Sequence, residues 1–324
     1  AGARSALFPS SSSLFSASTF RPFTGEDCSR KRPSAALGAA LPYLMLPVLE
    51  EGRLIVLTAV LPLLAVLIPG ETETPANSGS GNTPRSFRLS MLCAVTVIAA
   101  AAVVPTQPVI KRILSVNTSA YKSLSQTLRL PDTRISETHS GIRGRIDRVS
   151  SPYIRHAPGL SLTYSGAMPP QAAAFRDGDN RFVFYEDPSA PSLKFAEYLI
   201  AYLGYRMLED PQQVLIALDG GGSSIACAMA AGAGHITVLE SNPFLAREIG
   251  RHYRLPVVNR RLRAFLSRRE NRYDIIHIDN RGPSLPGASA LDQEYEFTRD
   301  AFILYLNHLN ETGVVIIERN LFLP

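Results

Sequence analysis

The stretch that decides the fold is residues 214–240, which read VLIALDGGGSSIACAMAAGAGHITVLE. It opens with Val214 to Leu218, a short, continuous apolar run of the kind expected for a parallel strand buried on both faces. A glycine run and an alanine-rich helical segment, Ile225 to Ala231, come next, and a second apolar run spans Ile236 to Leu239. A strand, a glycine turn, a helix and a second strand in this order predict a βαβ unit of an open α/β sheet.

Candidate binding residues lie where these two predicted strands end. Glycine lets the backbone approach a ligand closely, so the run Asp219, Gly220, Gly221 and Gly222 is a candidate cofactor loop. Glu240 ends the second strand 20 residues after Gly220. A carboxylate at that strand tip can accept hydrogen bonds from ribose hydroxyls, which predicts a nucleoside site.

A third strand is predicted over Tyr273 to Ile278, again a continuous apolar run, and it ends at Asp279. Ligands of open α/β sheets bind beyond the carboxyl ends of the strands, so Asp279 is a candidate binding and catalytic residue. The alternative is that Asp279 only caps a turn. Residues 298–309 are predicted to form a helix, and Val314 to Glu318 a further strand, after which we expect the usual terminal β-hairpin to be absent.

The segment before this sheet is predicted to be a small β-rich domain. Residues 130–187 contain short β-like runs broken by proline and glycine, among them Leu160 to Tyr164 and Arg181 to Tyr185. Residues 192–209 carry apolar side chains at helical spacing and predict one amphipathic helix. We therefore divide this half into a linker and β-rich domain at 113–190 and a Rossmann-like nucleoside-binding domain at 191–324.

The first third of the chain reads as a membrane region. Residues 1–34, rich in Ser, Arg and Pro, predict a disordered leader. Within 35–112, the uncharged apolar runs at about 54–70 and 89–109 approach the roughly 17–25 residues of a transmembrane helix. The run at 36–49 is shorter. If it also spans the membrane, the number of spans becomes odd and the predicted side of the C-terminal domain changes. Basic residues outside the two longer runs predict that the C-terminal domain lies in the cytoplasm. Buried helices of a soluble protein are the alternative.

Composition excludes several classes of protein. The net charge is +5, but the basic residues are dispersed and no nucleic-acid-binding motif accompanies them, so no nucleic-acid partner is predicted. The three cysteines are far apart and fit neither a disulfide framework nor a CxxC metal site. The six histidines are scattered as well, and no metal site is predicted.

Several motifs in order resemble a known family over roughly residues 119–324. They are SAYKSLSQTLRLP (119–131), SPYIRHAPGLSLTY (151–164), MPPQAAAFRDGD (168–179), the glycine unit through LESNP (239–243), RAFLSRRENRYDII (263–276) and EYEFTRDAFILYLNHLNETGVVIIER (294–319). The family is that of bacterial integral membrane proteins of the spermidine synthase-like, polyamine aminopropyltransferase type. In it, transmembrane helices precede a Rossmann-like class I methyltransferase/spermidine synthase domain.

The resemblance implies a multi-pass protein of the cell (inner) membrane with a cytoplasmic domain. That domain would bind S-adenosylmethionine or its decarboxylated form, with a polyamine as candidate acceptor. The resemblance leaves the oligomeric state open. By position, the three glycines match the cofactor loop, Glu240 the ribose-binding acid, and Asp279 the first acid of a DSSDP-like segment.

Departures from the family pattern bear on catalysis. Leu218 and Asp219 stand where the loop usually opens with glycine and a small residue, and Ser224 replaces an aspartate. Arg261 stands where an acid often contacts the adenine. Gly282 occupies the position of the second acid, which deprotonates the attacking amine in true synthases.

Three hypotheses follow. The first is a membrane-anchored transferase that uses an S-adenosylmethionine-type donor. The second is a non-enzymatic membrane protein that keeps the fold as a ligand sensor or assembly module. The third is an NAD-dependent oxidoreductase. It is the weakest of the three, because Ile225 stands where the dinucleotide pattern requires its third glycine.

Overall fold

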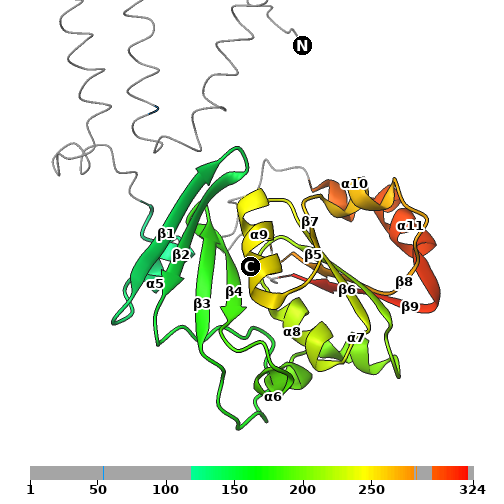
Figure 1. Cartoon of the computed structure of the whole chain (residues 1–324), viewed down its shortest axis with the longest axis horizontal. Helices are drawn as coiled ribbons and strands as arrows, with labels where there is room; N and C mark the ends of the chain where they lie inside the picture. Colours follow the sequence, from blue (N-terminus) through cyan, green and yellow to red (C-terminus); the bar gives the residue numbers. More distant parts are fainter. Residues whose placement is uncertain (1–53, 55–117, 281, 283–293, 320–324) are drawn as a thin grey trace, which may run out of the picture. The chain divides into compact units, whose positions relative to one another are not determined.

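The computed structural model describes residues 54, 118–280, 282 and 294–319. The predicted leader and the predicted membrane spans, apart from Leu54, lie outside these residues. Within the described ranges, no helix combines the length and the apolar character that crossing a bilayer requires. Two sheets account for the fold of the described part (Figure 1).

The first sheet is antiparallel, with the strand order β1-β2-β3-β4. A short helix, α5 (Ser123–Thr127), precedes the strands β1 (Arg134–Gly141), β2 (Gly144–Ser150), β3 (Gln171–Arg176) and β4 (Asp179–Tyr185). The predicted β-like run at Arg181 lies in β4. The prediction for Leu160 to Tyr164 was wrong, because these residues form turns, and Leu160 contributes a single bridge to Leu199.

That bridge also explains why the single helix predicted over 192–209 is wrong. The segment is divided into α6 (Ala190–Leu193), the 3₁₀ helix η1 (Lys194–Tyr198) and α7 (Tyr202–Arg206). Leu199 has an extended backbone (φ −79°, ψ 143°), and the flanking Ile200 N–H donates to the Gly159 carbonyl at 2.9 Å. The tertiary bridge therefore overrides the helical periodicity at this point.

The second sheet is parallel, with the order β7-β6-β5-β8-β9. Its strands are β5 (Gln213–Leu218), β6 (His235–Glu240), β7 (Val257–Val258), β8 (Tyr273–Asp279) and β9 (Leu309–Glu318). Numbered along the chain, this is the order 3-2-1-4-5 that is typical of Rossmann-like sheets. The structure thus confirms an α/β fold with a Rossmann-like parallel sheet.

Helices cover both faces of the parallel sheet (Figure 1). One face packs on α7, α8 (Ser223–Ala230) and α9 (Pro243–Tyr253), with a core that also takes in Phe182 and Phe184 of β4. The other face packs on α10 (Leu262–Leu266) and α11 (Arg299–Asn307), with Leu215 and Ile276 in the core. The 3₁₀ helix η2 (Tyr295–Phe297) precedes α11. Through Phe182 and Phe184, the antiparallel sheet packs on the face of the parallel sheet that α7, α8 and α9 cover.

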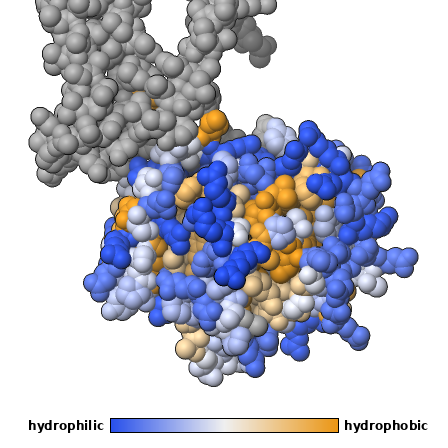
Figure 2. All heavy atoms as spheres, in the orientation of Figure 1, coloured by the Kyte–Doolittle hydropathy of each residue, from blue (hydrophilic) through white to orange (hydrophobic). Residues whose placement is uncertain are grey.

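The surface of the described part is mixed. In the view of Figure 2, hydrophilic residues cover its outer edges, and hydrophobic residues show mainly over the parallel strands beside α9.

The register of the parallel strands determines where their carboxyl ends lie. Leu218 of β5 is in register with Glu240 of β6 and with Asp279 of β8, so the three strand tips end at one level.

Candidate functional site

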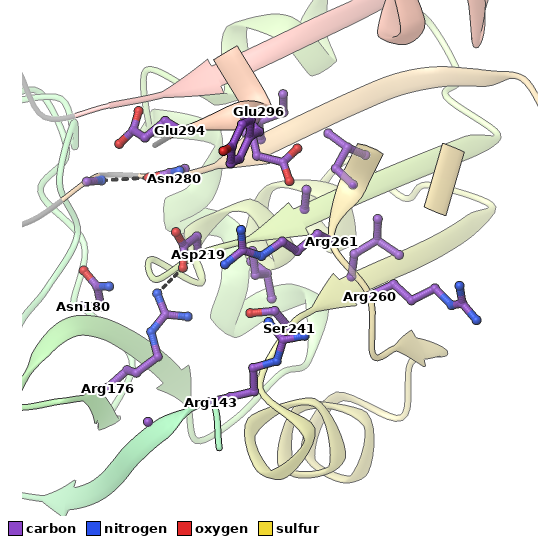
Figure 3. A pocket seen from close by; sticks show the side chains of 18 of the residues that line it. Arg143, Arg176, Asn180, Asp219, Ser241, Arg260, Arg261, Asn280, Glu294 and Glu296 are labelled. Carbon is purple, nitrogen blue, oxygen red and sulfur yellow. Dashed lines mark hydrogen bonds and ion pairs between the residues drawn. The ribbon is translucent and has the colours of Figure 1, made fainter. Parts of the chain in front are cut away.

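A cavity of about 590 Å³ opens at this level, outside the carboxyl ends of β5, β6 and β8. The chain order of the sheet reverses between β5 and β8, which is the position where open α/β sheets bind ligands. The facing wall comes from the antiparallel sheet, through its β1–β2 and β3–β4 turns. Residues after β7, after β8 and in η2 close the remaining sides (Figure 3).

The glycine loop lies behind the wall of this cavity. All three glycines have positive φ (+102°, +80° and +103°), and β4 forms a parallel bridge onto Gly221. The Gly221 N–H donates to the Arg181 carbonyl at 2.7 Å, and its carbonyl accepts from the Val183 N–H at 2.8 Å. A Cβ at Gly222 would lie 2.6 Å from the Val183 carbonyl oxygen. The close approach that needs glycine at 221 and 222 is therefore an approach to the protein itself, and a contact with ligand stays a prediction.

Asp279 is fully buried and holds this loop from the β8 side. Its Oδ2 accepts from the Gly222 N–H at 2.9 Å and from the Ser224 hydroxyl at 2.8 Å. Its backbone carbonyl accepts from the Asp219 N–H at 3.0 Å. These contacts position the glycine loop, while the neighbours Ile278 and Asn280 line the cavity. The catalytic assignment of Asp279 stays a prediction.

Glu240 is also fully buried, at the tip of β6. Its Oε1 accepts from the Asn242 N–H at 2.6 Å, whereas its Oε2 has no hydrogen-bond partner among the described residues. Burial raises the pKa of Glu240 to about 7, against the opposing effects of the Asn242 N–H and the Arg176 guanidinium. Leu239 and Ser241 on either side of it line the cavity.

Asp219 does line the cavity, and it forms an ion pair with Arg176 across it (Figure 3). Arg176 ends β3, so this pair joins the antiparallel sheet to the parallel sheet. Burial alone would lower the pKa of Arg176, but the carboxylates of Asp219, Glu240 and Asp177 together outweigh it and the pKa is raised. Sequence reasoning singled out Asp219 but missed Arg176, although Arg176 lies within the quoted motif at 168–179.

The segment after β8 is only partly described. The Gly282 N–H donates to the Asn280 side-chain oxygen at 3.0 Å, and both residues line the cavity. Arg261, which the resemblance places near an adenine, also lines it as the N-cap residue of α10. In the part of the chain that the structure describes, no three His, Cys, Asp or Glu side chains gather in a way that could hold a metal ion.

A second buried polar cluster lies away from the cavity and was missed from the sequence. His277 of β8 is fully buried; its Nδ1 lies 3.0 Å from the Tyr205 hydroxyl and its Nε2 lies 2.9 Å from Glu318 Oε1. This hydrogen-bonded chain connects α7, β8 and β9. Its geometry suits a structural role within the core.

Comparison with known proteins finds likeness in solved structures alone. No family model matches the chain, and no curated protein sequence matches it. The spermidine synthase of Thermotoga maritima is 18% identical, with 56% of each chain covered and a TM-score of 0.39. A spermidine synthase in complex with the transition-state analogue AdoDATO is 16% identical, with 56% of this chain and 55% of that chain covered and a TM-score of 0.38.

A putative SAM-dependent methyltransferase from Streptococcus mutans is 16% identical, with 48% of this chain and 43% of that chain covered and a TM-score of 0.29. The chain thus spans little more than half the length of the solved spermidine synthases it matches. At these scores the similarities concern fold and assign no activity.

Proposed function

We propose that the described part of the chain binds an adenosine-bearing donor, S-adenosylmethionine or its decarboxylated form, and acts as a transferase. The observation that carries this proposal is the buried Glu240 carboxylate with one unsatisfied oxygen, at a strand tip beside a cavity at the switch point of the sheet. A buried acceptor without a partner costs about 1–3 kcal/mol. A ribose hydroxyl that reached Oε2 would remove that cost, which favours a ligand with a sugar diol.

The membrane part of the proposal rests on the sequence. The uncharged runs at about 54–70 and 89–109 support multi-pass anchoring in the cell membrane, with the transferase domain on the cytoplasmic side. The acceptor is proposed to be an amine of the polyamine class, on the family resemblance alone.

A ligand sensor without catalysis is the second candidate, and two observations favour it. Asp279 is enclosed by the glycine loop, and Gly282 supplies no carboxylate that could deprotonate an amine. An acceptor amine would then lack a general base among these two positions.

Calorimetry on the full chain in non-ionic detergent tests the proposal, with S-adenosylmethionine, its decarboxylated form and methylthioadenosine as ligands. The ionised Glu240 is the better acceptor, so affinity should rise about tenfold from about pH 6 to about pH 8, as its ionised fraction grows around a pKa of about 7. Glu240→Gln should flatten this dependence. Glu270→Gln, at an exposed position, is the matched control.

Absence of binding by all three ligands would overturn the nucleoside site. Turnover with a polyamine acceptor separates the two candidates, because a sensor binds the donor without consuming it.

A further inference from the structure

Among the described residues that line the cavity, three arginines lack an ion-pair partner, against two carboxylates. Four acidic residues line it, and each has a partner. Asp177 Oδ1 accepts from the Arg145 N–H at 2.9 Å, Asp219 pairs with Arg176, Glu294 Oε1 accepts from Arg319 Nη2 at 3.0 Å, and Glu296 Oε2 accepts from the Tyr305 hydroxyl at 2.8 Å. Two of these carboxylates, Asp219 and Glu294, are therefore neutralised by arginines, while Asp177 and Glu296 keep their charge.

The arginines of the cavity divide differently. Arg143 lies in the β1–β2 turn, and Arg260 and Arg261 follow β7; all three line the cavity. Across the described residues, none of their guanidinium groups has a hydrogen bond or an ion pair. In Figure 3, the side chains of Arg143 and Arg261 point toward the space in front of Ser241 and Asp219, whereas Arg260 points away from it.

Two unpaired guanidinium groups that face one cavity repel each other and attract an anion. The planar guanidinium fork matches the oxygens of a phosphate or a carboxylate, and such charge-assisted bonds are the stronger class of hydrogen bond. A doubly cationic amine would be repelled by the same two arginines, so we expect it to bind near Asp177 or Glu296, away from them.

We propose that the ligand of this cavity carries an anionic group, a phosphate or a carboxylate, held by Arg143 and Arg261 beside Ser241. This inference rests on the proposed nucleoside site and names its substrate class, a nucleoside that carries a phosphate or carboxylate group. If the group is a carboxylate, S-adenosylmethionine should bind more tightly than its decarboxylated form. If it is a phosphate, a nucleotide should bind more tightly than the bare nucleoside.

Two matched ligand pairs test the inference on the full chain in non-ionic detergent. Adenosine against adenosine 5′-monophosphate tests phosphate, and decarboxylated against intact S-adenosylmethionine tests carboxylate. In at least one pair, the member that carries the phosphate or carboxylate should bind about tenfold more tightly or better, the worth of one charge-assisted contact. The pair that shows the preference identifies the anion.

Variants assign the preference to the two arginines. Arg143→Gln and Arg261→Gln should each reduce it at least threefold, and the double variant should abolish it. Arg261→Lys, which keeps the charge but loses the fork, should fall between. Arg268→Gln, at an exposed position that does not line the cavity, should leave it unchanged.

The outcomes separate the two proposals. Binding of the nucleosides without any preference for the members that carry a phosphate or carboxylate would overturn the inference and leave the nucleoside site standing. A preference that survives the double variant, or that falls equally in Arg268→Gln, would also overturn it. Absence of binding by every ligand would overturn the nucleoside site itself. Tyrosine fluorescence checks that each variant is folded.

Discussion

Replacing Glu240 with glutamine should remove a loss of folding stability that the protein shows as the pH rises. The pKa of Glu240 is raised by burial from 4.5 to about 7. The folded chain therefore holds a proton that the unfolded chain releases between these two values. The stabilisation is fully present below the unfolded pKa and is lost as the pH rises through the folded pKa.

The size of this effect follows from the two pKa values. Between about pH 5 and about pH 8, Glu240 should contribute a loss of about 2.5 kcal/mol in the free energy of unfolding. Glutamine cannot titrate, so the loss disappears in Glu240→Gln. The new amide group lacks an acceptor at the Oε2 position, which costs about 1–3 kcal/mol at every pH. The test is therefore the slope against pH rather than the stability at one pH.

Urea denaturation of the full chain in non-ionic detergent, followed by tyrosine fluorescence, measures this slope. The chain has no tryptophan and 12 tyrosines, of which all but Tyr43 lie between Tyr121 and Tyr305. The signal thus reports on the described part. Glu270→Gln should keep the wild-type slope. Equal slopes for wild type and Glu240→Gln would refute the idea that a buried, titrating carboxylate sits at the β6 tip.

Three further substitutions, with Gly232→Ala as a control, probe the loop and the core by the same denaturation assay. Gly221→Ala should cost at least about 3 kcal/mol, because φ is +80° and the new Cβ would overlap the Asp279 carboxylate, whereas Gly232→Ala, at φ +68° with open space around it, should cost only about 1–2 kcal/mol of backbone strain. Asp279→Ala should cost about 2–4 kcal/mol by orphaning the buried donors of the loop, and unchanged stability with lost binding would point to ligand contact instead. Tyr205→Phe should cost about 1–3 kcal/mol by leaving His277 Nδ1 unpaired. Unchanged stability would show that the hydrogen bond between Tyr205 and His277 does not stabilise the fold.

The parallel sheet could be predicted because its signals are local. Each strand of a sheet buried on both faces is a continuous apolar run, and β5, β6 and β8 lie within one residue of the predicted bounds. Their parallel pairing then places Glu240 and Asp279 level with Leu218, as expected for strand tips. The helix over 192–209 failed because a single non-local bridge at Leu199 decides the backbone there.

The site was harder to predict because its contacts join distant segments. The glycines suggested an open cradle, but β4 occupies the backbone of Gly221 across about 40 residues of sequence, a distance that no motif encodes. Arg143 and Arg176 enter the cavity only because two hairpin turns face the parallel sheet. Burial of Glu240 could be expected from its position in a buried strand. The unpaired Oε2 could not, because it depends on which side chains from distant segments reach it.

The electrostatic coupling across the cavity gives a final test of how the two sheets build the site together. Arg176 lowers the pKa of Glu240, and the Asp219 carboxylate raises it. Arg176→Met should therefore move the Glu240-linked loss of stability to a higher pH, and Asp219→Asn should move it to a lower pH. To measure the midpoint, the unfolding free energy of each variant is compared, at a series of pH values, with that of the same variant carrying Glu240→Gln. The midpoint is the pH at which half of the Glu240-linked difference is lost. Arg176 and Asp219 act on the pKa of Glu240 with opposite sign, so the two variants should shift the midpoint in opposite directions. Shifts in the same direction would show that the ion pair does not control the pKa of Glu240 electrostatically.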